Sequence, residues 1–337
     1  MIKIGLIGVG RMGTQHLERL LVSPYFRVIG CYDQQEQQLL HIEEEFGVTG
    51  FRNVEELIQQ CDAIDIITPT DTHLLYAEKA IKYGKHVFVE KPISTDIEKA
   101  KRLVELVREA NIIFQVGHIE RFNPAFLSLR EHALQPMLIE AHRLTTFDAK
   151  QHDQSVVLDL MMHDIDIVLH TVAANIKSIH ANGVSVLSDD IDIANARIEF
   201  DNGCVANLTA SRISLKQMRK MRIFQPFAYI SLDFLDKTAQ IVQLFAPDAS
   251  NLPPQDQLME FDTPGGKKWL HMQMPETAPV NAIQRELETF YDSIVQDSTP
   301  VVSLSDGLKA LELAHRILKE VEKRVKIGLE TTGIPLP

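Results

Sequence analysis

Residues Ile4 to Gly13 read I-G-L-I-G-V-G-R-M-G and place the spacing G-x-G-x-x-G directly after a run of apolar residues. Strand, glycine turn and helix in this order form the dinucleotide-binding unit of parallel α/β sheets. In that unit Gly8 permits the tight turn, Gly10 lets the backbone approach a pyrophosphate, and Gly13 lets the helix pack closely on the strand. The phosphates would accept hydrogen bonds from N–H groups at the helix N-terminus. A glycine-rich turn without a ligand is the alternative.

An acidic residue stands where such a unit needs one. Asp33 ends the second apolar run, 20 residues after Gly13. A carboxylate at this place accepts hydrogen bonds from the adenosine ribose. Its charge also repels a 2′-phosphate, and the following Gln34 and Gln35 supply no cation to offset it. The sequence therefore favours NAD over NADP, and a solvated turn acid is the alternative reading of Asp33.

Short apolar runs rich in Ile and Val alternate with amphipathic segments over residues 1–118. Continuous β-branched runs are typical of strands that are covered on both faces, as in a parallel sheet with crossover helices. The candidate strands span residues 2–7, 26–32, 63–67, 86–89 and 112–116, and the candidate helices span residues 72–83 and 97–110. We expect a Rossmann dinucleotide-binding domain over residues 1–120.

The pattern changes after Arg121, and residues 121–337 predict a second domain with helices and an antiparallel sheet. Asp201-Asn202-Gly203 predicts a hairpin turn, because Asn and Gly tolerate positive φ. Six of the 15 prolines fall in residues 246–279, which predicts a long irregular segment there. The expected strands flanking the hairpin turn are 193–200 and 205–210, and the expected helices are 155–172, 280–295 and a C-terminal helix of about 305–326 that is a candidate to pack back on the first domain.

Composition narrows the class of protein. The 337-residue chain suits two domains, and 45% apolar with 24% charged residues is ordinary globular usage. A net charge of −12 disfavours nucleic acid as a partner. Cys31, Cys61 and Cys204 are too dispersed for a zinc site, and no apolar run reaches the roughly 18 uncharged residues of a membrane helix. We expect a cytoplasmic protein with no metal and no membrane partner.

Two groups of residues are spaced for acid–base chemistry. Lys91 follows the run 86–89, at the carboxyl edge where open α/β sheets bind ligands. Asp159 and His163 stand four apart on one predicted helix face, so the carboxylate can orient the imidazole. Histidine titrates near neutrality and can accept a hydroxyl proton, while the Lys91 ammonium can hydrogen-bond a developing alkoxide. A neutral Lys91 could take the proton itself, and a surface lysine with a core histidine is the purely structural alternative.

Other polar residues accompany these motifs. Arg121 and Asn123 follow the last strand of the first domain and could contact sugar hydroxyls or phosphate, although Asn123 could equally cap a helix. His16 is expected to be a packed or exposed histidine rather than a ligand. A basic cluster in this acidic chain suits either a substrate diphosphate or a solvated strand edge, and it comprises Arg212, Lys216, Arg219, Lys220 and Arg222.

Five motifs together resemble the glucose–fructose oxidoreductase, inositol dehydrogenase and rhizopine catabolism family (Gfo/Idh/MocA). They are G-V-G-R-M-G from Gly8, T-P-T-D-T-H from Thr68, E-K-P from Glu90, G-H-I-E-R-F-N-P from Gly117, and D-x-x-x-H from Asp159. The resemblance covers the first half and the central sheet, and it weakens after Pro247. It implies an α/β second domain with a large open, mostly antiparallel sheet, subunit contacts through that sheet in a homodimer or homotetramer, and NAD-dependent oxidation or reduction at a sugar or polyol carbon.

The resemblance also assigns site residues. Lys91, His163 and Asp159 are the expected catalytic residues, and the expected substrate contacts are these three with Arg121 and Asn123. The expected cofactor contacts are Gly8, Gly10, Arg11, Met12, Gly13, Asp33, Thr68, Pro69, Thr70, His73, Glu90 and Lys91. A strand-end turn is the alternative for the residues from Thr68 to His73.

Three functions are compatible with these motifs. The first is a sugar dehydrogenase, and G-H-I-E-R-F-N-P looks most like the UDP-N-acetylglucosamine 3-dehydrogenases, with inositol or a simple sugar as the other substrate class. The second is a biliverdin-type reductase, which Asp159 and His163 disfavour. The third is a non-catalytic NAD-sensing regulator, which Lys91 disfavours.

Overall fold

The computed structural model describes residues 1–147, 155–188, 190–250 and 252–332, and the chain divides into two compact units. The first unit contains residues 1–122 and 280–312, and the second contains 123–279 and the chain from 313 onward. The sequence assigns residues 121–337 to the second domain, with the C-terminal helix as a candidate to pack back on the first. The structure instead groups 280–312 with the first unit, because Ile283, Leu287 and Phe290 pack into its hydrophobic core.

The first unit is built on a six-stranded parallel sheet in the order β3-β2-β1-β4-β5-β6. This order reverses between β1 and β4, which creates a crevice at the carboxyl ends of those strands where doubly wound sheets bind ligands. The strands are β1 (Ile2–Ile7), β2 (Phe26–Tyr32), β3 (Gly50–Phe51), β4 (Ala63–Ile66), β5 (His86–Glu90) and β6 (Phe114–Gly117).

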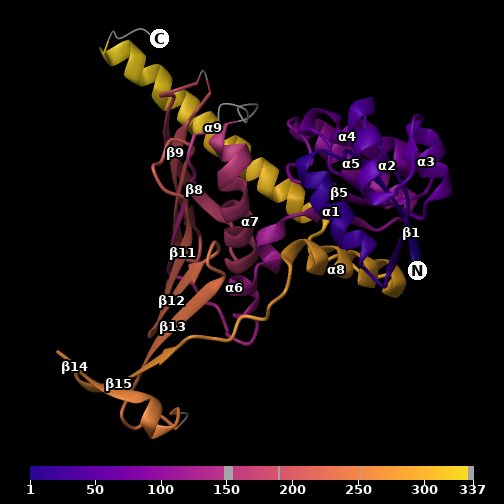
Figure 1. Ribbon diagram of the computed structural model, residues 1–337. Helices are drawn as coiled ribbons and strands as arrows, with labels where there is room; N and C mark the ends of the chain where they lie inside the picture. The colour runs from indigo at the N-terminus through magenta and orange to yellow at the C-terminus, as the bar shows by residue number, and fades with distance from the viewer. Residues whose placement is uncertain (148–154, 189, 251, 333–337) are drawn as a thin grey trace. The chain divides into compact units, whose positions relative to one another are not determined.

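Helices connect and cover this sheet (Figure 1). They are α1 (Arg11–Leu21), α2 (Glu36–Phe46), α3 (Val54–Gln60), α4 (Thr70–Lys82), α5 (Ile97–Ala110), the 3-10 turn η1 (Ile119–Phe122) and α8 (Ala282–Gln296). All four residues of β4 are buried, as expected for a central strand covered on both faces. The predicted Rossmann architecture is confirmed.

The second unit contains a nine-stranded sheet in the order β14-β15-β13-β12-β11-β7-β10-β9-β8. Among the strands that the structure describes in this sheet, only β7 and β10 pair in parallel. The strands are β7 (Leu138–Leu144), β8 (Ile176–Val184), β9 (Ile193–Phe200), β10 (Val205–Ser211), β11 (Met218–Gln225), β12 (Ala228–Asp233), β13 (Thr238–Phe245), β14 (Leu258–Thr263) and β15 (Gly266–Gln273). This large, mostly antiparallel sheet confirms the predicted class of the second domain.

One face of the nine-stranded sheet is covered by short helices (Figure 1). These are α6 (Pro124–Leu127), the π turn η2 (Val157–Met161) and α7 (Met162–Thr171); the 3-10 turn η3 (Gln255–Gln257) lies before β14, and the long α9 (Leu304–Thr332) ends the described chain. Along β7, Ile139, Ala141 and Arg143 are buried, and the alternate residues are more exposed. The strand period of two therefore divides each central strand into a helix-covered side and an open side.

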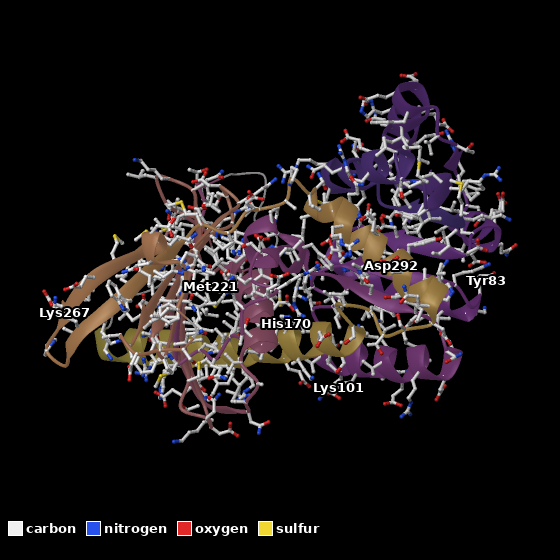
Figure 2. The ribbon with its side chains drawn as sticks, turned by 90° about the horizontal axis from the view of Figure 1, so that it is seen from below. Tyr83, Lys101, His170, Met221, Lys267 and Asp292 are labelled. Atoms are coloured by element: carbon white, nitrogen blue, oxygen red, sulfur yellow. The ribbon has the colours of Figure 1, made fainter. Side chains whose placement is uncertain are left out.

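One expectation for the second unit is wrong, and another holds with a local difference. Residues 246–279 contain the hairpin of β14 and β15, and Lys267 marks its projecting end (Figure 2). The prolines lie outside the paired strands, with Pro264 in the connecting turn, so they do not interrupt the ladder. The single helix expected over 155–172 begins with the π turn η2 before α7. A π turn inserts one extra residue into a helix, which hydrophobic spacing does not reveal.

Candidate functional site

At two positions of the glycine-rich loop after β1, there is no room for a side chain. Gly8 has φ +92°, and a Cβ there would lie 2.6 Å from the carbonyl oxygen of Ile67. A Cβ on Gly13 would lie 2.1 Å from the carbonyl oxygen of Gly8. The loop is therefore tightly closed between β1 and α1, and the exposed Arg11 begins the helix directly after Gly10. This is the backbone geometry with which a helix N-terminus receives a pyrophosphate.

Asp33 is fixed against this loop. One oxygen of its carboxylate accepts a hydrogen bond from the Val9 amide at 2.9 Å, and the other accepts from the Gln35 amide at 2.8 Å. Each carboxylate oxygen has a second lone pair that can accept from a ribose hydroxyl. Arg52 is a cation in this region, since both Arg52 and Asp33 lie near Cys31. It donates hydrogen bonds to Glu43 and to the Gly50 carbonyl. Its charge is already balanced, and a 2′-phosphate would gain little from it.

The turn from Thr68 to Thr70 is tied to the end of β5 by His73. The two ring nitrogens of His73 lie 2.7 Å from the Thr68 carbonyl oxygen and 2.9 Å from the Pro92 carbonyl oxygen. Burial lowers the pKa of His73, and the two carbonyls oppose that shift because only a doubly protonated ring donates to both. His73 is 1% exposed, so its ring lies enclosed between the two loops that it connects. Pro69 is exposed beside it, whereas Thr70 is buried at the start of α4.

A second histidine lies beside the end of β5, directly before Lys91. His16 on α1 is fully buried; its Nδ1 lies 3.0 Å from Asp65 of β4, and its Nε2 lies 3.3 Å from Glu90 of β5. The second oxygen of Glu90 accepts from the Lys91 amide at 3.2 Å. The carboxylate of Glu90, one of the expected cofactor contacts, faces this buried group. His16 is packed, as expected, and it is also ionically paired, which its sequence position does not reveal.

The charges of this buried group follow from its geometry. Burial by itself would lower the pKa of His16, but Asp65 and Glu90 outweigh that effect and raise the pKa to about 10. Burial likewise opposes ionisation of Glu90, yet the His16 imidazolium keeps the pKa of Glu90 below its ordinary value. One imidazolium therefore bridges carboxylates from two adjacent strands, although burial raises the pKa of the Asp65 carboxylate above its ordinary value. It fixes the strand end from which Lys91 projects.

In the second unit, the expected catalytic pair lies across the junction of η2 and α7. Asp159 is exposed within the π turn, and His163 is half-buried in the first turn of α7. The neighbouring Asp164 forms a buried bidentate ion pair with Arg143 of β7, at 2.9 and 3.0 Å. Arg143 also lies over the Phe234 ring, 5.7 Å from its centroid. These contacts attach the helix that carries His163 to the sheet.

The other two expected substrate residues, Arg121 and Asn123, are buried. Arg121 of the first unit is 5% exposed in η1. In the second unit, the Asn123 side-chain oxygen accepts from the Ala125 amide at 3.0 Å, and its amide group donates to the Phe234 carbonyl at 3.0 Å. Asn123 is therefore a helix cap, which was one of the two roles expected for it.

The basic cluster is divided by the strands that carry it. Arg212 is buried against Asp192, while Lys220 and Arg222 form exposed ion pairs with Asp233 at 3.0 Å and Glu140 at 3.8 Å. Arg219 is exposed and stands opposite Arg143 in the β11–β7 register. Paired residues of antiparallel strands share a face, so Arg219 lies on the side of α7 and Arg222 on the open side. The exposed Lys216 lies in the loop before β11.

Comparison with known proteins agrees with this arrangement. Residues 2–118 match the family model described as "Oxidoreductase family, NAD-binding Rossmann fold", and residues 126–225 match the GFO/IDH/MocA C-terminal domain. The chain is 35% identical to the UDP-N-acetylglucosamine 3-dehydrogenase of Acidithiobacillus ferrooxidans over 75% of its own length and 80% of that protein. The chain belongs to the Gfo/Idh/MocA oxidoreductase family. It is an oxidoreductase with an NAD-binding domain.

Solved structures and inositol dehydrogenases extend the similarity. A crystal structure of the A. ferrooxidans enzyme superposes with a TM-score of 0.85 at 31% identity, over 96% of this chain and 98% of that one. The myo-inositol 2-dehydrogenase of Thermotoga maritima is 26% identical over 98% of this chain and 99% of its own. The NAD-dependent scyllo-inositol 2-dehydrogenase of Bacillus subtilis is 29% identical over 63% of this chain and 68% of its own. Family membership thus includes more than one substrate class.

The described residues hold neither a metal-binding cluster nor a helix that could cross a membrane. Within the ranges given above, no group of three or more histidine, cysteine, aspartate or glutamate side chains is arranged to hold a metal ion. No helix in the described part of the chain is both long and apolar enough to span a bilayer.

Asp33 provides a test of cofactor preference. We expect the wild type to bind NADH more tightly than NADPH by about 1–3 kcal/mol, the usual cost of an unfavourable buried polar contact. Asp33→Ser should weaken NADH binding and reduce this preference, because it removes the ribose acceptor and the repulsive charge. Fluorescence titration with NADH and NADPH measures the two affinities. The control is Glu36→Ser, which removes an exposed acid three residues further on. Equal affinities in the wild type would contradict the role of Asp33.

His16 provides a test of pH dependence. Its pKa rises from 6.5 to about 10 on folding, so its protonation stabilises the folded state fully below pH 6.5, and this stability is lost as pH rises toward 10. We expect up to about 1.4 kcal/mol of unfolding free energy to be lost per pH unit. The triple variant His16→Gln, Asp65→Asn, Glu90→Gln lacks all three charges and serves as the reference. Urea unfolding compares the pH dependence of its unfolding free energy with that of the wild type. Nitrogen-15 NMR of the wild-type ring is the direct check, and deprotonation between pH 6 and 7 would refute the assignment.

Proposed function

We propose that this oxidoreductase uses NAD to oxidise a ring hydroxyl of a nucleotide sugar, at C3 of a UDP-N-acetylhexosamine. The observation that carries the proposal is the 35% identity to a UDP-N-acetylglucosamine 3-dehydrogenase over 80% of that protein. The candidate residues Lys91, Asp159 and His163 support the same chemistry. The second candidate is an inositol dehydrogenase, which the full-length similarity to the T. maritima enzyme favours.

The residues of the proposed nucleotide site suit NAD. The closed loop from Gly8 to Gly13 offers backbone amides to the phosphates, and the fixed carboxylate of Asp33 offers oxygens to the adenosine ribose. Thr68 and Pro69 form the neighbouring turn, held by His73. When bound, NAD accepts the hydride that leaves the carbinol carbon.

The remaining chemistry is proton transfer and orientation by this chain. We assign His163 as the base that accepts the hydroxyl proton during oxidation and returns it during reduction, because an imidazole titrates near neutrality. Asp159 orients the ring and stabilises the imidazolium that results. Lys91 donates a hydrogen bond to the developing alkoxide. The alternative, in which a neutral Lys91 takes the proton, predicts that the His163 variant retains a substantial part of its activity.

Substitution of Lys91 and His163 tests these roles. Lys91→Met and His163→Asn should each lower kcat about a hundredfold or more and leave NADH affinity nearly unchanged, since the other expected cofactor contacts, the glycine loop and Asp33 among them, stay intact. Matched controls are Lys82→Met at the end of α4 and His170→Asn at the end of α7, whose side chains are exposed. Steady-state absorbance of NADH measures turnover, and wild-type kcat in either active-site variant would remove its role.

The substrate class is tested by a panel of UDP-N-acetylglucosamine, N-acetylglucosamine and myo-inositol. We expect activity on the UDP form and about a tenfold higher KM for it in Arg219→Ala, the value of one charge-assisted hydrogen bond to phosphate. Arg222→Ala, three residues along the same strand on the opposite face, is the matched control and should leave KM unchanged. Activity on inositol or the free sugar alone would overturn the nucleotide-sugar proposal. NADH binding without turnover of any substrate would favour a regulator.

We further propose that the open face of the nine-stranded sheet forms the contacts of a homodimer or homotetramer. The register places an apolar row across five strands on this face, made of Val205, Leu138, Phe224, Tyr229 and Val242. Apolar rows of this kind favour burial against a second copy. Light scattering at micromolar concentration should show an oligomer that Phe224→Asp weakens, and a wild-type monomer would contradict the proposal.

A cytoplasmic location is part of the same proposal. The three cysteines are buried free thiols, and burial raises the pKa of Cys31 and of Cys61 to about 12. Thiols of this kind need no oxidising compartment. Cell fractionation is the check, and recovery of the enzyme outside the cytoplasmic fraction would exclude this location.

A further inference from the structure

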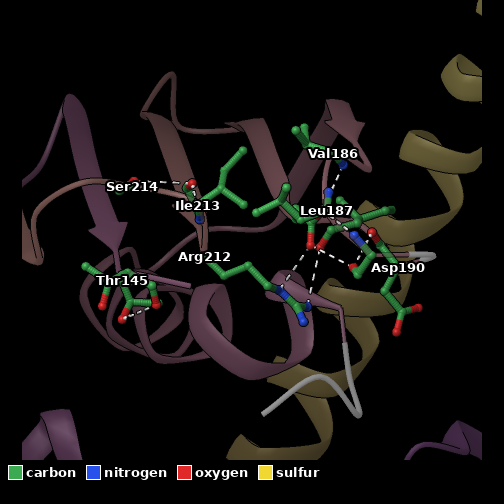
Figure 3. A network of polar contacts seen from close by, with 12 residues as sticks. Thr145, Val186, Leu187, Asp190, Arg212, Ile213 and Ser214 are labelled. Atoms are coloured by element: carbon green, nitrogen blue, oxygen red, sulfur yellow. Dashed lines mark hydrogen bonds and ion pairs between the residues drawn. The ribbon is translucent and has the colours of Figure 1, made fainter. Parts of the chain in front are cut away.

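A network of polar contacts in the second unit surrounds the carboxylate of Asp192, and Figure 3 labels Val186, Leu187 and Arg212 within it. One oxygen accepts the backbone amides of Val186, Leu187 and Ser188 at 2.7, 2.6 and 3.1 Å, and the other accepts the Ser188 hydroxyl at 2.7 Å. The Arg212 guanidinium lies 3.7 Å from the second oxygen. The side chains of Asp192 and Arg212 are 0% and 7% exposed. Arg212 is therefore not available to a substrate diphosphate.

The same network reaches the start of the helix that carries the proposed catalytic pair. The Ile191 carbonyl accepts from the Arg212 guanidinium at 3.5 Å and from the Val156 amide at 3.2 Å. Val156 is the cap of η2, and it directly follows Ser155, whose carbonyl accepts the Asp159 amide at 3.0 Å. Two hydrogen-bonded steps thus connect the Arg212 guanidinium with the first turn that contains Asp159.

The backbone bonds of this region fix the network to the sheet. The Asp192 amide donates to the Val184 carbonyl at 3.0 Å, and the Arg212 amide donates to the Asp192 carbonyl at 2.9 Å. β8, β9 and β10 therefore hold the Ile191 carbonyl at a defined place. The extra residue of a π turn shifts the following side chains around the helix axis, so the position of its first residue bears on where Asp159 and His163 lie. Any displacement of Val156 would be passed to Asp159 first.

We propose that Arg212 and Asp192 are positioning residues that set the place of the Asp159 carboxylate, and through it the orientation of His163. The inference rests on the roles proposed above for Asp159 and His163. A buried ion pair keeps its geometry because separating the two charges leaves each of them away from water and without its opposite charge. The pair thereby acts on catalysis without touching substrate or cofactor.

The first test compares kcat with KM. Arg212→Met should lower kcat about tenfold with little change in the KM for NAD, and Arg212→Lys should recover part of the loss because it keeps the charge. Lys220→Met, from the same basic cluster but in an exposed ion pair, is the matched control and should behave as wild type. If Arg212→Met does not fold, Asp192→Asn replaces it, since that change keeps the size and an acceptor oxygen for the backbone amides.

The second test asks whether the effect passes through Asp159. Loss of a well-placed carboxylate lowers the pKa of an imidazole, so the acid limb of the kcat–pH profile should shift down by about 0.5–1 unit in Arg212→Met or Asp192→Asn. In an Asp159→Asn background the same change should add no further shift or loss, as a double-mutant cycle would show. Unfolding midpoints measured in parallel identify any variant whose loss is only one of stability.

The outcomes separate the two proposals. Wild-type activity of His163→Asn would remove the role proposed for His163, and with it the positioning role of Arg212 and Asp192, whereas a wild type that turns over no member of the substrate panel would remove the proposed function itself. An inactive His163→Asn, together with an unshifted pH profile in Arg212→Met and Asp192→Asn, would overturn the positioning role alone. Full additivity with Asp159→Asn would do the same.

Discussion

The buried contact of His16 with Asp65 and Glu90 organises the carboxyl edge of the first sheet. An imidazolium between two carboxylates has no access to water, so its charge is stabilised only while α1, β4 and β5 keep their spacing. α1 also begins at the glycine loop, and β5 ends at Lys91. The element that presents backbone amides to a pyrophosphate and the strand that presents Lys91 are thus fixed by one set of charges.

The second unit uses the same principle with arginine. Arg143 pairs with Asp164, the residue after His163, and Arg212 pairs with Asp192 beside the start of η2. Both pairs are almost entirely buried, whereas the proposed catalytic Asp159 is exposed. Rigid charge pairs beneath an exposed reactive group are what a preorganised site requires, because the energy of holding the geometry is met before the substrate arrives.

The sequence predicts the elements whose signals are local. The G-x-G-x-x-G spacing with Asp33 and the β-branched runs are sufficient for the parallel sheet, and Asp201-Asn202-Gly203 is sufficient for the β9–β10 hairpin. The two-residue β3 is too short to give a signal, and the prolines around β14 and β15 conceal that hairpin because they fall just outside its ladder. What remains hidden depends on pairing between distant strands. His16 contacts residues of two other elements, and Asp192 meets Arg212 only through the β9–β10 register.

The division of the basic cluster shows why its composition alone could not settle its role. Five cations within eleven residues suggest one function, but the strand period of two sends Arg219 to the α7 side and Arg222 to the open side, while Arg212 is buried before the strand begins. Exposed ion pairs such as that of Arg222 contribute little free energy, and a buried pair such as that of Arg212 is costly to break. Arg219 is exposed on the α7 side and belongs to neither buried pair. The proposed role of Arg219 in substrate range is thus compatible with an unchanged set of buried charges beside His163 and Lys91, as expected where one fold carries several functions.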